Sequence, residues 1–166
     1  MRSQSSCVAL ALLIGALVAA SAPAAAAAEG TAQPIASAET NWSGVAIDLM
    51  SVERKASVLT VKWVVRNHGS EQQDVRFGLT GKHVTTYVVD EESGTKYYVL
   101  TDKEEHSVAS MHEYIGSDTY GTSEYIPAGE TRRYWAKFPA PPPEVKTLTL
   151  FFTKAEPFEE VPITDR

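Results

Sequence analysis

The sequence predicts an all-β protein, an immunoglobulin-like antiparallel β-sandwich of about seven to nine strands. Short segments of alternating apolar and polar residues recur along the chain, which is the period of half-buried strands. Turn-forming residues separate these segments every eight to twelve positions or so. No segment has the apolar period of a long amphipathic helix. Strict alternation gives each strand one buried and one solvated face, which favours two packed antiparallel sheets.

The first 28 residues are predicted to be a signal peptide rather than part of the fold. Arg2 precedes the apolar run Val8–Ala20, and small residues continue as far as Ala28. The run is shorter than the ~20 residues of a membrane-spanning helix, so we expect cleavage after Ala28 and no span in the mature chain. The protein would then be exported from a bacterium, to the periplasm or the medium. We expect residues 29–41 to form a flexible leader and residues 42–166 to form a single β-sandwich domain.

Charge and cysteine content exclude several classes of protein. Without the signal peptide, 14 basic residues face 21 acidic ones, a net charge of about −7. Nucleic acids and anionic membranes recruit basic surfaces instead, so we expect neither as a partner. Cys7 lies in the signal peptide, so the hydrophobic core must stabilise the mature chain without disulfides.

The alternation also places the strands. Val45–Val52 changes parity at Leu49 and Met50, which predicts a bulge or bend there. Leu59–Arg66 is the most regular strand, and Trp63 is assigned to the core. Trp42 and Trp135 fit either core or surface. Further strands are expected at Val75–Leu79, Thr85–Asp90, Thr95–Leu100, Ser107–Met111, Thr131–Phe138, Lys146–Phe152 and Phe158–Ile163.

A proline run, PAPPP from Pro139 to Pro143, separates two of these strands. Proline fixes φ and cannot donate a backbone hydrogen bond. We therefore expect the run to carry the chain from one sheet to the other and to protect a sheet edge from pairing with another chain. A P-x-x-P ligand for an SH3-like partner is disfavoured, because an exported protein does not meet such cytosolic partners.

Several turns and core positions resemble a known family. The chain carries Y-V-V-D-x-x-x-G-x-K-Y-Y-V-L from Tyr87, I-P-A-G-E from Ile126 and W-A-K-F-P-A-P-P from Trp135. This order is similar to exported bacterial immunoglobulin-like domains of the DUF4352 type. The matching positions are Asp90, Gly94, Tyr97, Pro127, Gly129, Glu130 and Phe138. The resemblance implies a sandwich module in the envelope or outside the cell, and it implies no catalytic residue.

The sequence predicts no metal site. A blue-copper centre needs a cysteine thiolate, and the four histidines form no H-x-H pair. Closeness of His106, Met111 and His112 in sequence leaves a copper site as a less favoured alternative. The acidic segments Asp90–Gly94 and Asp102–Glu105 lack EF-hand spacing and are expected to be solvated loops.

The sequence also predicts no catalytic residue and no cofactor. There is no G-x-S-x-G elbow. Glu159 and Glu160 are adjacent, and we expect them to point to opposite faces of a strand, so that they would not converge on one bond.

Three tyrosines are the clearest functional lead. Tyr114, Tyr120 and Tyr125 lie in an irregular segment rich in Ser, Thr and Gly, a composition typical of loops that bind proteins or sugars. The favoured hypothesis is a non-catalytic exported module for protein–protein interaction or cell-envelope structure, whose partner is another envelope or extracellular protein. A small-ligand or carbohydrate-binding module that uses these tyrosines is the alternative. A metal-handling or hydrolytic protein is less favoured, and the tyrosines also fit a purely structural role.

Overall fold

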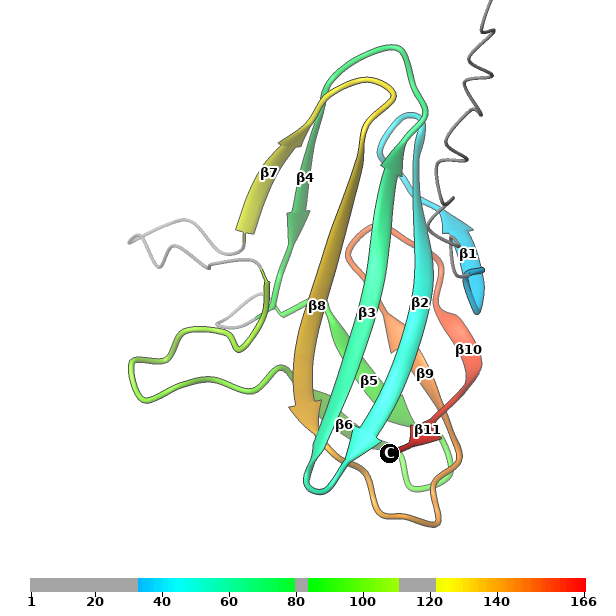
Figure 1. The fold of residues 1–166 in the computed structure, drawn as a ribbon, viewed down its shortest axis with the longest axis vertical. Helices are drawn as coiled ribbons and strands as arrows, with labels where there is room; N and C mark the ends of the chain where they lie inside the picture. Colours follow the sequence, from blue (N-terminus) through cyan, green and yellow to red (C-terminus); the bar gives the residue numbers. More distant parts are fainter. Residues whose placement is uncertain (1–32, 80–83, 111–121) are drawn as a thin grey trace, which may run out of the picture. The chain divides into compact units, whose positions relative to one another are not determined.

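A computed structural model describes residues 33–79, 84–110 and 122–166, without the side chains of residues 122 and 123. Within these ranges the chain forms eleven strands and no helix, so the predicted all-β class is confirmed (Figure 1). The described residues contain no helix that is long and apolar enough to cross a membrane. The strands exceed the predicted seven to nine because the short β1, β7 and β11 were not anticipated from the sequence.

The larger sheet has five strands, in the order β1-β2-β3-β8, with β11 beside β2. All its pairs are antiparallel except β11 with β2. A register shift between Leu49 and Ser51 confirms the predicted bulge at Met50. The strands are β1 (Ala36–Glu39), β2 (Val45–Lys55), β3 (Val58–Asn67), β8 (Thr131–Pro139) and β11 (Thr164–Asp165).

The second sheet has four antiparallel strands in the order β10-β9-β5-β6. The β5–β6 hairpin confirms the one that the sequence predicts. A separate two-stranded sheet pairs β4 with β7. These strands are β4 (Gln73–Phe77), β5 (Tyr87–Asp90), β6 (Thr95–Tyr98), β7 (Thr122–Ile126), β9 (Thr147–Phe151) and β10 (Phe158–Pro162). Figure 1 shows β2, β3 and β8 in front of β5 and β9, the two layers of the sandwich.

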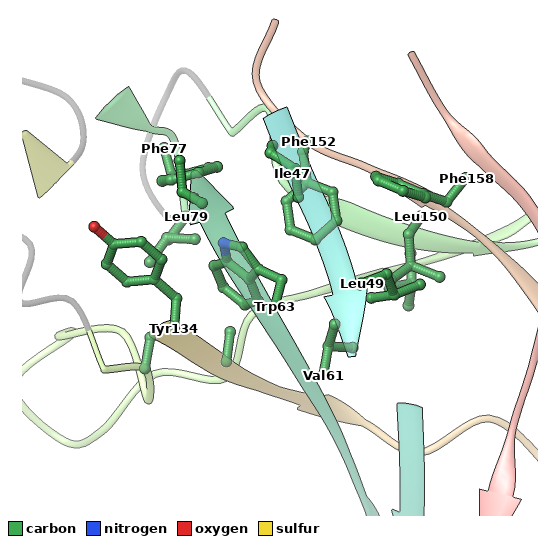
Figure 2. Close-up of a cluster of buried hydrophobic side chains, with 14 of the residues drawn as sticks. Ile47, Leu49, Val61, Trp63, Phe77, Leu79, Tyr134, Leu150, Phe152 and Phe158 are labelled. Atoms are coloured by element: carbon green, nitrogen blue, oxygen red, sulfur yellow. The ribbon is translucent and has the colours of Figure 1, made fainter. Parts of the chain in front are cut away.

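An aromatic cluster around Trp63 of β3 forms the centre of the core between the layers. Trp63 is 1% exposed, and its ring centroid lies 5.7 Å from Phe77, 5.9 Å from Tyr134 and 5.1 Å from Phe152. Figure 2 shows these rings around Trp63. Tilted and edge-on pairs at such distances add to the stability gained from burial. The core assignment of Trp63 is confirmed, Trp42 is also buried, and Trp135 is exposed.

Strand β1 corrects part of the predicted leader. The sequence predicts flexibility through Asn41, yet Ala36–Glu39 pairs with β2, and Ala36 and Ala38 pack against the core. The prediction is wrong for these residues because alanine alternating with polar residues gives a weak apolar period. The strand expected at Ser107–Met111 is likewise absent over residues 107–110, where Ser107 and Ala109 form only isolated bridges. Met111 lies outside the described residues.

The proline run joins the two sheets, as the sequence predicts. It leaves β8 in the five-stranded sheet and leads to β9 in the four-stranded sheet. Arg54 of β2 holds it in place, donating from one nitrogen to the carbonyl of Pro142 at 2.6 Å and to that of Val145 at 3.1 Å. The backbone carbonyls of this crossing do not pair with a neighbouring strand that the structure describes. The buried guanidinium of Arg54 has five N–H donors and supplies hydrogen bonds to them.

Candidate functional site

A hollow of about 610 Å³, which we call the acidic hollow, lies along the first half of β9. Three segments line it, namely the end of β5 with its turn, the loop that leads into β9, and β10. Lys146 is the one basic residue of the lining. The acidic residues of the lining are Asp90, Glu91, Glu92, Glu144, Glu159 and Glu160. The charges come from parts of the sequence that only the fold brings together.

A bulge in β10 places two of these glutamates. Phe158 pairs with Leu150 and Val161 with Leu148, so Glu159 and Glu160 stand opposite the single residue Thr149 of β9. Both glutamates are exposed and both line the acidic hollow. The expectation that they point to opposite faces is therefore wrong. The available signal was the spacing of the two apolar residues, because Phe158 and Val161 are three positions apart instead of two.

Thr149 lies within the acidic hollow. It alternates with the core residues Leu148 and Leu150, so its side chain belongs to the sheet face that points away from the core. The residue is only 4% exposed, yet its hydroxyl makes no hydrogen bond to any residue that the structure describes. The hydroxyl is not among the described polar atoms that are both sealed from solvent and unpaired, which belong to Ser51, Trp63 and Thr86. It therefore reaches the surface of the hollow and can donate to, or accept from, a group bound there.

Asp90 has a structural partner, unlike the glutamates. Its carboxylate accepts hydrogen bonds from the Ser93 hydroxyl at 2.5 Å and from the backbone N–H of Glu92 at 3.1 Å. These bonds close the β5–β6 turn in the manner of an Asx turn. The five glutamates of the hollow form no ion pair within the described part of the chain. Lys146 is directed elsewhere, to the carbonyl of Pro143 at 2.7 Å.

A row of aromatic side chains continues the same sheet face beyond the acidic hollow. This aromatic row consists of Tyr98, Tyr87 and Phe151, which are neighbours across β6, β5 and β9. Tyr87 stacks on Phe151 with ring centroids 4.7 Å apart and lies 6.0 Å from Tyr98. The ammonium of Lys96 lies 4.8 Å from the Tyr87 centroid. Phe151 is two positions beyond Thr149, so the row adjoins the hollow.

The side chains that could ligate a metal ion together lie outside the acidic hollow. Among the described residues, three such groups come within 4.8 Å of one another only at Asp102, Glu104 and His106. All three are exposed, and His106 Nδ1 lies 3.3 Å from Asp102. Hydrogen bonds, first from the His106 backbone and also from that of Glu104, lower the pKa of Asp102. Met111 and His112, which the copper hypothesis would need, lie outside the described residues.

The structure describes only one of the three predicted tyrosines. Tyr125 lies in β7 opposite Asp74 and is 62% exposed. Arg76 beside it donates to Asp74 at 3.0 Å. Tyr114 and Tyr120 lie outside the described residues. Tyr125 belongs to the two-stranded sheet and does not line the acidic hollow. The tyrosine predicted from the sequence and the acidic hollow are therefore separate candidate surfaces.

A second hollow, of about 260 Å³, lies on the outer face of the five-stranded sheet. We call it the Trp135 hollow; Met50, Val64 and Trp135 give it an apolar lining, with Lys62 and Arg133 beside them. Met50 occupies the bulge of β2. Trp135 is 37% exposed, and the Lys137 ammonium lies 5.8 Å from its ring. This hollow is smaller than the acidic one and carries the opposite charge.

Comparisons of the chain with protein-family models, with curated proteins and with solved structures find no match. The fold itself places the protein among antiparallel β-sandwiches. The acidic hollow and the aromatic row both lie on its four-stranded sheet. The resemblance to exported immunoglobulin-like domains stays a prediction.

Proposed function

We propose that the protein is a non-catalytic, exported β-sandwich that binds another protein of the cell envelope or the extracellular space through the acidic hollow. One observation carries the proposal. Five glutamates line the hollow without an ion pair among the described residues, together with a Thr149 hydroxyl that has no hydrogen-bond partner there. A concave surface with polar groups that are not used within the protein is typical of a binding site.

The arrangement of the carboxylates supports a binding role. They are distributed over three segments of the chain that line one hollow. Negative charges distributed along a hollow fit a partner that makes many contacts.

The predicted signal peptide supports a role outside the cytosol. Residues 1–28 have the charge, apolar run and small residues of a cleaved signal. We therefore place the partner in the envelope or the medium. Fractionation of the source cells tests this location, and recovery of the protein in the cytosol would contradict it.

Site-specific photocrosslinking in the source cells tests the binding role. A photoreactive residue at Thr147, which is exposed and lines the acidic hollow, should capture a defined partner. The same residue at Thr131 of β8, exposed on the other sheet, is the control. Identical products from both positions, or none from Thr147, would contradict the proposal.

The Trp135 hollow supports a second candidate function, a small-ligand or carbohydrate-binding module. An exposed tryptophan beside an apolar depression offers a ring face on which a sugar or another small apolar ligand can stack. A glycan array tests this candidate with the parent and with Trp135→Ala. Binding by the parent that the variant loses would support it, and an array without any binding would remove it.

A further inference from the structure

We infer that the partner segment bound in the acidic hollow is an extended stretch of chain rich in lysine and arginine. The inference rests on the proposed function and adds the chemistry of the partner. It is carried by the charge of the hollow, by the free hydroxyl of Thr149, and by the aromatic row beside them.

The charge of the hollow selects a basic partner. Five glutamates line it without an ion pair among the described residues, and the lysine of the lining is directed to Pro143 and Asp165. Complementary charge steers a partner to its site and excludes partners of the wrong sign. An acidic or neutral segment would leave these carboxylates uncompensated.

The spacing of the charges selects a chain over a single metal ion. A calcium ion needs six to eight oxygen ligands at about 2.3–2.6 Å, so its carboxylates have to converge. In the described part of the chain no group of three acidic side chains in the hollow converges within 4.8 Å. Successive basic side chains of an extended segment can each meet a different carboxylate.

Thr149 supplies a polar contact between the charges. Its hydroxyl can accept from an ammonium, a guanidinium or a backbone N–H, and it can donate to a backbone carbonyl. A bound partner would exclude water from this hydroxyl, so a hydrogen bond to the partner would have to replace the one to water. The partner should therefore contact Thr149 directly.

The aromatic row extends the site beyond the charges. Lys96 over the Tyr87 ring shows that this face already accommodates an ammonium on an aromatic ring. Tyr98 is 49% exposed and is available for another. From Thr147 to Phe151 the strand rises about 13 Å, so about four residues of an extended partner would span hollow and row.

Binding of labelled octapeptides, followed by fluorescence anisotropy, tests the inference. One peptide alternates Lys and Arg with Ser, a second has Glu at the basic positions, and a third is uncharged. The proteins are the parent, Glu159→Gln with Glu160→Gln, and Thr149→Val. The matched control is Glu71→Gln with Glu104→Gln, which changes the net charge equally at exposed positions outside the hollow.

We expect only the basic peptide to bind the parent, with affinity falling as salt rises. The hollow double variant should bind about five-fold or more weakly, since each exposed ion pair is worth up to several-fold in affinity. Thr149→Val should also weaken binding, whereas the control pair should change it less than about two-fold. Circular dichroism checks that each variant is folded.

Several outcomes would overturn the inference. They are failure of the basic peptide to bind, equal weakening by both double variants, and calcium binding that the hollow variant loses while peptide binding stays. If Thr147 still crosslinks a partner in cells while the basic peptide fails, the basic partner is wrong and the binding role stands. If the peptide binds but Thr147 captures nothing, the site chemistry stands and the proposed function fails.

Discussion

Arg54 donates a hydrogen bond from Nε to Asp165 Oδ1 at 2.6 Å, and so links the central strand β2 to the terminal strand β11. Arg54 is 5% exposed at its side chain and Asp165 is 57% exposed. The remaining nitrogens of the guanidinium bind the proline crossing through the carbonyls of Pro141, Pro142, Pro143 and Val145. One buried side chain thus holds both the end of the chain and the connection between the sheets.

Replacing Arg54 by alanine should lower the free energy of unfolding by about 2–3 kcal/mol, because several charged hydrogen bonds are lost from a buried place. Asp165→Asn should cost less, since its carboxylate is exposed and the proline contacts of Arg54 remain. Urea denaturation of the two variants measures the difference. Equal losses would mean that the proline carbonyls contribute nothing to the effect.

Two paired carboxylates make the fold sensitive to acid. The side-chain hydrogen bond from Arg66 lowers the pKa of Asp48, and the bond from Arg54 lowers the pKa of Asp165, each from an ordinary value of 3.8. In the unfolded chain both bind a proton more readily, so their contribution is complete above about pH 4 and is lost as the pH falls below that value.

The free energy of unfolding should therefore drop between about pH 4 and pH 2, and the double variant Asp48→Asn with Asp165→Asn should lose part of that slope. Urea midpoints measured across this range give the result. An unchanged slope in the variant would show that other groups cause the acid sensitivity.

The strands of the sandwich were largely predictable from residue order. Alternation located Val45–Val52 with its bulge and Leu59–Arg66 with Trp63, and the prolines identified the crossing. The partners of Arg54 were not predictable, because Asp165 is 111 positions away in sequence. Asn67 is a similar case: it reads as a turn residue, yet it is 1% exposed and donates to the carbonyl of Ile126 at 2.9 Å.

Gly44 lies where its backbone closely approaches that of Gly69. It has φ of 68°, and a Cβ there would lie 2.6 Å from the Cα of Gly69. Gly94 has the same φ, but a Cβ there would meet no atom within 4 Å. Gly94→Ala should thus cost about 1–2 kcal/mol for the left-handed conformation alone.

Gly44→Ala should cost distinctly more than Gly94→Ala, because two backbone segments would have to separate. Thermal or urea unfolding of both variants makes the comparison. If the two glycines prove equally tolerant, the close approach of Gly44 and Gly69 does not stabilise the fold.

Tyr125→Ala should leave the free energy of unfolding within about 0.5 kcal/mol of the parent value, since the side chain is 62% exposed. It should also leave binding of the basic peptide unchanged, because Tyr125 does not line the acidic hollow. Urea denaturation and the anisotropy titration check both statements. Loss of peptide binding in this variant would move the site to the two-stranded sheet.

The candidate site was much less predictable than the fold. Its residues come from the turn after β5, the loop before β9 and the bulge of β10, and a sequence does not reveal which loops will meet. The hypothesis of a tyrosine-bearing binding surface rested on amino-acid composition. Composition indicates where irregular loops lie, but it does not show which strands or loops will be neighbours in the fold. The three-residue spacing from Phe158 to Val161 was the one local sign of the bulge that brings Glu159 and Glu160 to Thr149.

An NMR titration of the parent with the basic octapeptide tests the central claim most directly. The account predicts amide shift changes concentrated at the acidic hollow, at Glu91, Lys146, Thr149 and Glu160, and continuing to Phe151 of the aromatic row. Shift changes around Trp135 or Tyr125 instead, or none at all, would contradict it.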